Sequence, residues 1–214
     1  LQNVLIKLQK GEDKNEILNH FQQAQDKINN QVSKIIKNND IIFTHCHSTN
    51  VVKALIYAKK QGKHFEVYNT ETRPLFQGRK TASELGKAGI KVTMFVDSAL
   101  NIALKKADKI FLGADAILKN SDVINKVGSG MISEMAKYHK IPVYIIADSW
   151  KFTKNNIKLE QRNYKEVWDN PDISKNIKIN NPAFEKVPAK NIKYIVSEFG
   201  VLTPKEFVRR VNIR

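Results

Sequence analysis

Apolar residues recur along this chain at two different spacings, and segments of the two kinds alternate. Between Asn15 and Lys37 they recur every three or four residues, which predicts one long amphipathic helix. The polar triplet at 38–40 ends this pattern, and the β-branched and aromatic run 41–44 is typical of a buried strand. The chain is therefore expected to enter its first strand from a long helix.

The same alternation predicts the later elements. Further strands are expected at 64–69, 91–96, 108–113, 142–147 and 192–197. Helices are expected at 50–61, 79–88, 98–106 and 129–139, with a final helix from Pro204. No regular element is predicted for the segment 115–127 or for the long irregular stretch 149–191.

Repeated alternation of short apolar strands with helices predicts an α/β fold: a Rossmann-like, mostly parallel sheet with helices on both faces. We expect a helical N-terminal segment at 1–39 and one Rossmann-like α/β domain at 40–214 that binds the ligand. No G-x-G-x-x-G pattern follows the first strand, so the fold by itself gives no reason to propose a dinucleotide.

Charge changes this picture only slightly. Thirty-six Lys and Arg against 21 Asp and Glu give a formal charge of +15, which suits a nucleic acid or a phosphorylated substrate. The lysines are scattered, with no dense basic run and no aromatic-basic signature of an RNA-binding sheet. A solvated lysine surface is the simpler interpretation, and a nucleic-acid partner is not expected.

Cysteine usage and hydropathy indicate a compartment. The single cysteine excludes an intramolecular disulfide framework, and no apolar run is long enough for a membrane span or follows a charged leader. These features favour a cytoplasmic protein without a membrane partner. The chain opens on Leu1 where a natural start would have Met, so we expect a fragment boundary there.

Two polar clusters follow predicted strands. They are Thr44-His45-Cys46-His47-Ser48 and Gly113-Ala114-Asp115. Because the carboxyl ends of parallel strands line the ligand crevice, Cys46 and Asp115 are expected to face one pocket, as in an acid–base site. The thiol is either a small buried hydrophobe or a reactive group whose pKa is lowered by nearby cations and a helix N-terminus. Asp115 is either a cap for the next segment or catalytic.

Three other segments carry candidate chemistry. The stretch 70–79 is either a surface loop or, with two arginines and a glutamate, an anion or oligomer contact. Asn125-Lys126-Val127-Gly128-Ser129-Gly130 forms a Gly-rich turn before a helix, which can cradle a phosphate but is a weak signal alone. Lys151 is a further cation at this edge. His45 and His47 beside one cysteine rank low as a metal site.

Taken together, these motifs resemble one family. It unites ribose 1,5-bisphosphate isomerases, methylthioribose 1-phosphate isomerases and the alpha, beta and delta regulatory subunits of translation initiation factor 2B. The resemblance covers about residues 12–211 and is strongest to the archaeal ribose 1,5-bisphosphate isomerases. The motifs that carry it are His45-Cys46, Glu71-Thr72-Arg73-Pro74, Gln77-Gly78-Arg79, Gly113-Ala114-Asp115, Asn125-Lys126-Val127-Gly128 and Ser149-Trp150-Lys151-Phe152.

The resemblance implies catalytic roles for Cys46 and Asp115, a pair that the regulatory subunits generally lack. It also implies that residues 1–39 are the remnant of a truncated helical domain and that the protein is at least a homodimer. No metal or other cofactor is expected. The residues expected to bind the substrate are Ser48, Thr49, Asn50, Arg73, Gln77, Asn125, Lys126 and Lys151.

The leading hypothesis is therefore a metal- and NAD-independent aldose–ketose isomerase that converts ribose 1,5-bisphosphate to ribulose 1,5-bisphosphate in nucleotide salvage. The rival is a non-catalytic regulatory subunit that binds a nucleotide or sugar phosphate and an initiation-factor partner. The Cys46 and Asp115 pair favours the enzyme. One feature favours the rival instead: these 214 residues contain no Arg-Gly segment of the kind that the family isomerases use to hold phosphate.

Overall fold

A seven-stranded sheet forms the centre of the protein, which is described here by a computed structural model of residues 2–213. Its strands lie in the spatial order β11-β10-β7-β4-β1-β2-β3, and every neighbouring pair is parallel except β10 with β11. The strands are β1 (Asp40–Thr44), β2 (Phe65–Thr70), β3 (Lys91–Phe95), β4 (Lys109–Leu112), β7 (Val143–Ile146), β10 (Tyr194–Ser197) and β11 (Gly200–Leu202).

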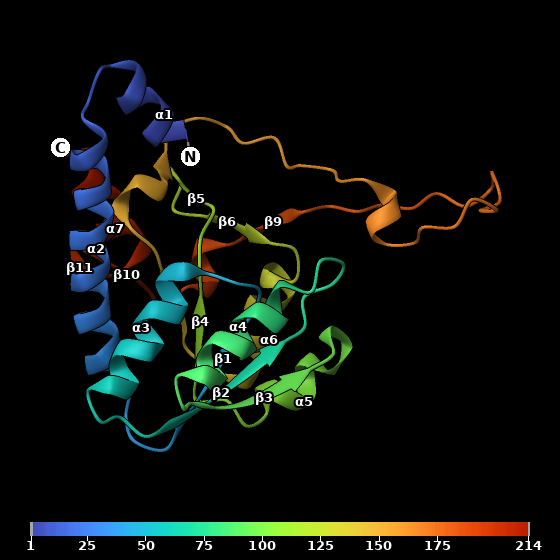
Figure 1. The fold of residues 1–214 in the computed structure, drawn as a ribbon, viewed down its shortest axis with the longest axis horizontal. Coiled ribbons are helices and arrows are strands. Elements are labelled where there is room, and N and C mark those ends of the chain that lie inside the picture. Colours follow the sequence, from blue (N-terminus) through green and yellow to red (C-terminus); the bar gives the residue numbers. More distant parts are fainter. Residues whose placement is uncertain (1, 214) are drawn as a thin grey trace.

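Helices cover both faces of this sheet (Figure 1). One face is covered by α2 (Lys14–Ile35), α3 (Thr49–Lys60) and α4 (Gln77–Lys87). The other is covered by α5 (Leu100–Leu104), α6 (Ser129–His139) and α7 (Pro204–Asn212). The short helix α1 (Gln2–Gln9) precedes α2.

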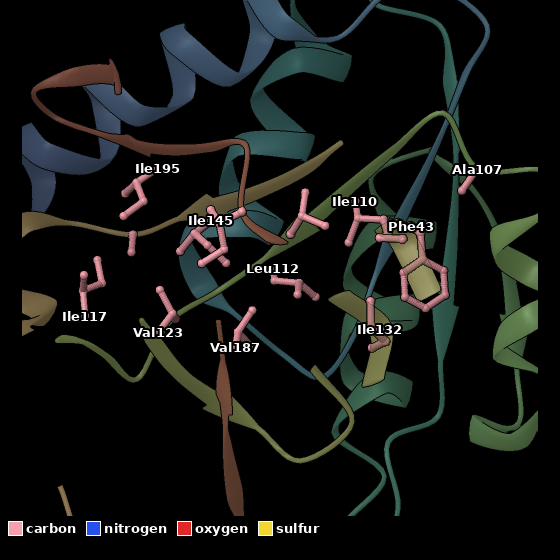
Figure 2. Packing of buried hydrophobic residues seen from close by; sticks show 14 of the residues in the cluster. Phe43, Ala107, Ile110, Leu112, Ile117, Val123, Ile132, Ile145, Val187 and Ile195 are labelled. Atoms are coloured by element: carbon pink, nitrogen blue, oxygen red, sulfur yellow. The ribbon is translucent and has the colours of Figure 1, made fainter. Parts of the chain in front are cut away.

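Successive side chains of the central strands point to opposite faces, so each strand supplies both layers of the core. Ile42 packs in the cluster under α2 and α3, whereas Phe43 packs in the cluster under α5 and α6. In β4, Phe111 belongs to the first cluster, and Ile110 and Leu112 belong to the second (Figure 2). A strand that is buried on both faces consists of consecutive apolar residues, so these strands can be predicted from the sequence.

The predicted fold class is confirmed. The order β3-β2-β1-β4-β7-β10 is that of a doubly wound Rossmann sheet, and its strand order reverses between β1 and β4. The predicted helices and strands are present with ends displaced by at most two residues, except that 98–106 forms the 3₁₀ turn η1 (Asp97–Ala99) followed by α5. Division of the chain at residue 39 stays a prediction.

A second, smaller sheet lies in segments for which no element was predicted. It has the order β8-β5-β6-β9, formed by β5 (Ala116–Leu118), β6 (Val123–Lys126), β8 (Phe152–Thr153) and β9 (Phe184–Val187). Ile117, Val123 and Val187 from this sheet are fully buried against the central sheet (Figure 2). Strands of two to four residues are too short to display a period, so the sequence pattern did not reveal them.

Residues 154–183 extend from the body as a long arm (Figure 1). The arm contains the 3₁₀ turn η3 (Tyr164–Glu166), and two more such turns flank it in sequence, η2 (Ser149–Lys151) and η4 (Ala189–Asn191). No helix within residues 2–213 combines the length and apolar character needed to cross a bilayer.

Candidate functional site

Cys46 and Asp115 lie in the loops that follow the carboxyl ends of β1 and β4, the two strands between which the order reverses. This is where open α/β sheets bind ligands. The loops after the two strands approach closely, because a Cβ added at Gly113 would lie 2.6 Å from Oγ of Ser48. Glycine at 113 thus lets the Asp115 loop pack against the start of α3.

A polar pocket of about 200 Å³ opens at this point. Six of the predicted site residues line it together, namely Ser48, Thr49, Asn50, Asp115, Asn125 and Lys151. Ser48 is the N-cap of α3 but forms no capping bond through its side chain. The first N–H groups of a helix have no intrahelical partner and carry its positive dipole end, so the pocket is suited to an anion.

Lys126 adds a second positive charge to this region from the end of β6. Its side chain is buried, yet no carboxylate within residues 2–213 lies within ion-pair distance of its ammonium. The ammonium acts electrostatically on both Cys46 and Asp115. A buried charge without a partner is costly, and an anionic ligand would supply the missing counter-charge.

Burial raises the pKa of Asp115, and the positive charges of Lys151 and Lys126 oppose that effect without cancelling it. A raised pKa is the direction required of a carboxyl group that donates a proton near neutral pH. The same side chain, with Lys151, also borders a wider pocket of about 630 Å³. Asp115 therefore lies between two cavities and is open to a ligand from either.

The expectation that the environment lowers the pKa of the Cys46 thiol is wrong. Burial raises this pKa, and the negative charges of Asp115 and Asp97 raise it further. The backbone N–H of His47 and the charge of Lys126 act in the opposite direction but are outweighed. The thiol therefore stays protonated near neutral pH in the unliganded protein, because desolvation of the thiolate costs more than these partners return.

His45 has a structural role. The buried ring donates from Nε2 to the carbonyl oxygen of Val127 (2.9 Å), so Nδ1 accepts from the hydroxyl of Thr70 (2.5 Å). Burial lowers its pKa and keeps it neutral. Gly128 has φ +101° and a Cβ there would lie 2.9 Å from Nε2, so only glycine fits beside the ring.

The two histidines of the His45-x-His47 pair do not converge on a metal site. Nε2 of His47 lies 3.2 Å from Glu84, a residue of α4, while both ring nitrogens of His45 are occupied. Within the described part of the chain, no three His, Cys, Asp or Glu side chains are grouped as a metal site would require.

Four predicted site residues do not line the polar pocket, namely Cys46, Lys126, Arg73 and Gln77. Of these, Arg73 and Gln77 come from the loop after β2 and the start of α4. Arg73 is exposed, borders a neighbouring cavity of about 190 Å³, and donates to the carbonyl oxygen of Val167 in the arm (3.1 Å). Gln77 begins α4, and its side-chain oxygen is buried without a hydrogen-bond partner in the described chain. The structure does not bring either residue into contact with the Asp115 pocket, so their substrate roles stay predictions.

Sequence reasoning missed Asp97, which follows β3. Its carboxylate accepts from the backbone N–H groups of Thr72 (2.9 Å) and Arg73 (2.7 Å) and so holds the loop after β2. The available signal was its position: a carboxylate directly after a predicted strand, as with Asp115. Sequence spacing did not reveal that this residue reaches the neighbouring loop.

Comparison with known proteins gives one family. The model of the initiation factor 2 subunit family matches residues 7–204. Ribose 1,5-bisphosphate isomerase from Thermococcus kodakarensis is 36% identical over 197 residues, which are 88% of this chain and 61% of the relative. The protein of the same name from Pyrococcus furiosus is 37% identical over 197 residues, with the same coverage. The chain thus spans about three fifths of the length of these curated relatives.

A solved structure gives the same result for the fold. The crystal structure described as translation initiation factor eIF-2B of Pyrococcus horikoshii superimposes with a TM-score of 0.82 at 28% identity. The match covers 90% of this chain and 69% of that one. Proteins with isomerase names and proteins with initiation-factor names are therefore both similar to this chain.

Proposed function

The chain belongs to the initiation factor 2 subunit family, and on that premise we propose that it acts as an aldose–ketose isomerase converting ribose 1,5-bisphosphate to ribulose 1,5-bisphosphate. The observation that carries the proposal is the surroundings of Asp115. This carboxyl of raised pKa lines the polar pocket together with the uncapped start of α3 and Lys151, and its charge acts on the thiol of Cys46. Acid–base groups next to an anion pocket suit a phosphorylated sugar. The relatives at 36–37% identity bear the name of this activity.

The pocket suits one phosphate group of the substrate. The start of α3 and the ammonium of Lys151 offer backbone N–H donors and a charge, and Asn125 borders the same space. The unpaired ammonium of Lys126 is available for the same dianion or for charge that develops on the sugar. Ser48, Thr49 and Asn50 contribute the helix start.

The chemistry requires two groups. The anomeric oxygen of the substrate carries phosphate, so the ring cannot open as a free hemiacetal. Asp115 donates a proton to the ring oxygen as the bond from C1 to that oxygen breaks, and Cys46 as thiolate removes the proton at C2. The Asp115 carboxylate then accepts the C2 hydroxyl proton of the resulting cis-enol, and the Cys46 thiol gives a proton to C1. This yields the ketose bisphosphate and restores both groups. Proton transfers of this kind need no metal or nicotinamide.

Phosphorus NMR of the protein with ribose 1,5-bisphosphate tests this function. The substrate resonances are expected to convert to those of ribulose 1,5-bisphosphate without added metal or nicotinamide. Cys46→Ser and Asp115→Asn keep the shape of each side chain and remove its acid–base function, so turnover should fall at least about 10²-fold. Their melting temperatures should stay close to that of the wild type.

Two results would contradict the proposal. Unchanged substrate together with tight binding to an initiation factor would support the regulatory role, which the name of the P. horikoshii structure suggests. Early melting of Cys46→Ser with unchanged turnover of the folded fraction would make Cys46 a packing residue only.

We also propose a homodimer or a higher homo-oligomer. Exposed apolar side chains support it, including Met131 and Tyr138 on α6 and Trp168 on the arm, because such surface is often covered by a partner. Light scattering with size-exclusion chromatography is expected to give at least twice the 24.5 kDa mass of this chain. A monomer at micromolar concentration would refute this part.

A further inference from the structure

The backbone of Cys46 is held in an unusual conformation by two threonines. Its φ is +66°, a left-handed conformation that residues other than glycine seldom adopt. The N–H of Cys46 donates to Oγ1 of Thr72 (2.9 Å), and its carbonyl oxygen accepts from Oγ1 of Thr81 (2.8 Å). Both backbone polar groups of Cys46 are therefore bound by side chains from elsewhere in the fold.

Thr72 is itself held in a strained conformation. It is fully buried, β-branched and at φ +63°, a combination that counts as an outlier for such residues. Its N–H is bound by the Asp97 carboxylate at 2.9 Å, and the other oxygen of that carboxylate binds the N–H of Arg73 at 2.7 Å. Asp97 thus fixes the loop from which Thr72 reaches Cys46.

Thr81 reaches Cys46 because α4 lies unusually close to β2. A Cβ added at Gly78 would be 1.8 Å from the carbonyl oxygen of Thr70, so only glycine allows this approach. Asn69 also binds the carbonyl oxygen of Gly78 through Nδ2 (2.8 Å). Strained backbone persists only where its surroundings determine it from several sides, and such positions cluster at functional sites.

We propose that Asp97, Thr72 and Thr81 are positioning residues that hold Cys46 in its left-handed conformation and so aim the thiol at the substrate. This inference rests on the proposed isomerase function. None of the three needs to touch the substrate: Thr72 and Thr81 act on the backbone of Cys46, and Asp97 acts through Thr72. A small displacement of a reacting group costs up to about 10²-fold in rate, so rigid backbone support matters for turnover.

The matched pair Thr72→Val and Thr72→Ser tests the inference. Valine keeps the shape and removes the oxygen that accepts from the Cys46 N–H, whereas serine keeps that oxygen. Thr72→Val is expected to lower kcat by about 10- to 100-fold with KM within about threefold, because the orientation of the thiol changes and phosphate binding does not. Thr72→Ser should retain much more turnover.

Asp97→Asn should lower kcat in the same way, because the amide accepts at one oxygen only. Asp108→Asn is the control: that carboxylate also binds a backbone N–H, that of Ile41 (2.8 Å), but precedes β4 at the opposite edge of the sheet. The Asp108→Asn control should have the kcat of the wild type.

A wild-type kcat in both Thr72→Val and Asp97→Asn would overturn the inference. If Thr72→Val does not fold, Thr81→Val against Thr81→Ser replaces it, with the same expected results.

A second measurement separates this inference from the proposed function. The rate of Cys46 alkylation by iodoacetamide, followed against pH, requires no turnover. Asp97→Asn should shift its midpoint to lower pH, because a negative charge near the thiol is removed. Hydrogen exchange of the Cys46 amide should be faster in Thr72→Val than in Thr72→Ser. If the wild type does not turn over the substrate but both the alkylation midpoint and the amide exchange change as expected, only the isomerase function is refuted. If the wild type is active and neither quantity changes, the positioning role is refuted.

Discussion

At the scale of single residues, Cys46 and Asp115 differ in their tendency to ionise although burial acts on both. The thiol has its pKa raised from an already high ordinary value, and the carboxyl has its pKa raised from a low one. The thiol therefore titrates above the carboxyl. The proposed reaction needs a thiolate together with a protonated carboxyl, which is a minor population of the free protein. This population is constant between the two pKa values and declines outside them.

The pH dependence of kcat/KM should consequently be bell-shaped. Activity falls on the acid side as Cys46 and Asp115 are both held protonated, and on the alkaline side as Asp115 and Cys46 are both ionised. Because both pKa values are raised, both limbs should lie at higher pH than for a free carboxyl and a free thiol. The measurement is kcat/KM against pH with the free enzyme's limbs fitted. An alkaline limb below the usual thiol range would contradict the account.

Lys126 links ligand binding with stability, because it is a buried residue whose ammonium forms no ion pair within the described chain. Lys126→Met removes that unpaired charge, so the free protein should melt at a higher temperature. The same change should weaken binding of the sugar bisphosphate by about 1–3 kcal/mol, the range for a hydrogen bond assisted by charge. Calorimetry measures both effects.

Lys10 and Lys59, changed to Met, serve as controls for this prediction. Neither lines the polar pocket, so ligand affinity should stay at the wild-type value. Equal losses for all three lysines would mean that only the overall positive field matters.

At the scale of elements, the close contact of α4 with the end of β2 brings Thr81 to Cys46. Gly78→Ala should therefore displace α4, since the new Cβ would overlap a backbone oxygen that cannot move without distorting β2. We expect a loss of about 2–4 kcal/mol in the free energy of unfolding, in the range for overpacked or strained buried sites. Urea denaturation measures it.

Gly86→Ala is the matched control in the same helix. A Cβ there meets nothing within 4 Å, and alanine favours a helix interior over glycine. This variant should be as stable as the wild type or more stable. Equal destabilisation of the two variants would mean that the tight contact at Gly78 is unimportant.

At the scale of the whole molecule, the carboxyl ends of the central strands form the candidate site, whereas their amino ends contribute to stability. The candidate site lies at the carboxyl edge, whereas the opposite edge contains a buried ion pair between Lys109 and Asp40 (2.6 Å). Asp40 also accepts from the N–H of Lys37 at 2.6 Å, which ties the end of the α2 segment to β1. This pair joins β1 to β4 far from the pocket.

Lys109→Met should separate stability from activity. Removing one partner leaves the Asp40 carboxylate buried without its counter-charge, which costs about 3–5 kcal/mol. The kcat of the folded fraction should not change, because neither of the two pockets that Asp115 lines includes Lys109. Thermal unfolding and turnover below the melting range measure the two quantities. A parallel loss of kcat would show that the two edges are coupled.

The amino-acid sequence by itself determined the central architecture and the identity of the candidate groups. Strands buried on both faces consist of consecutive apolar residues, and helices with one buried face have apolar residues at a period near 3.6. The α/β alternation was therefore predictable from the local pattern. The loops after β1 and β4 could be paired from topology alone. Residue pattern and topology were therefore enough to identify Cys46, Asp115 and the residues around the start of α3 as candidates.

Only the tertiary structure decided the environment of those groups. The small sheet of β5, β6, β8 and β9 arises from contacts between strands too short to carry a pattern. The direction of the thiol pKa depends on how much water surrounds Cys46, and that follows from packing. Asp97 acts across the space between two loops that are separated in sequence. Burial and through-space contact are properties of the folded chain, so residue spacing could not reveal them.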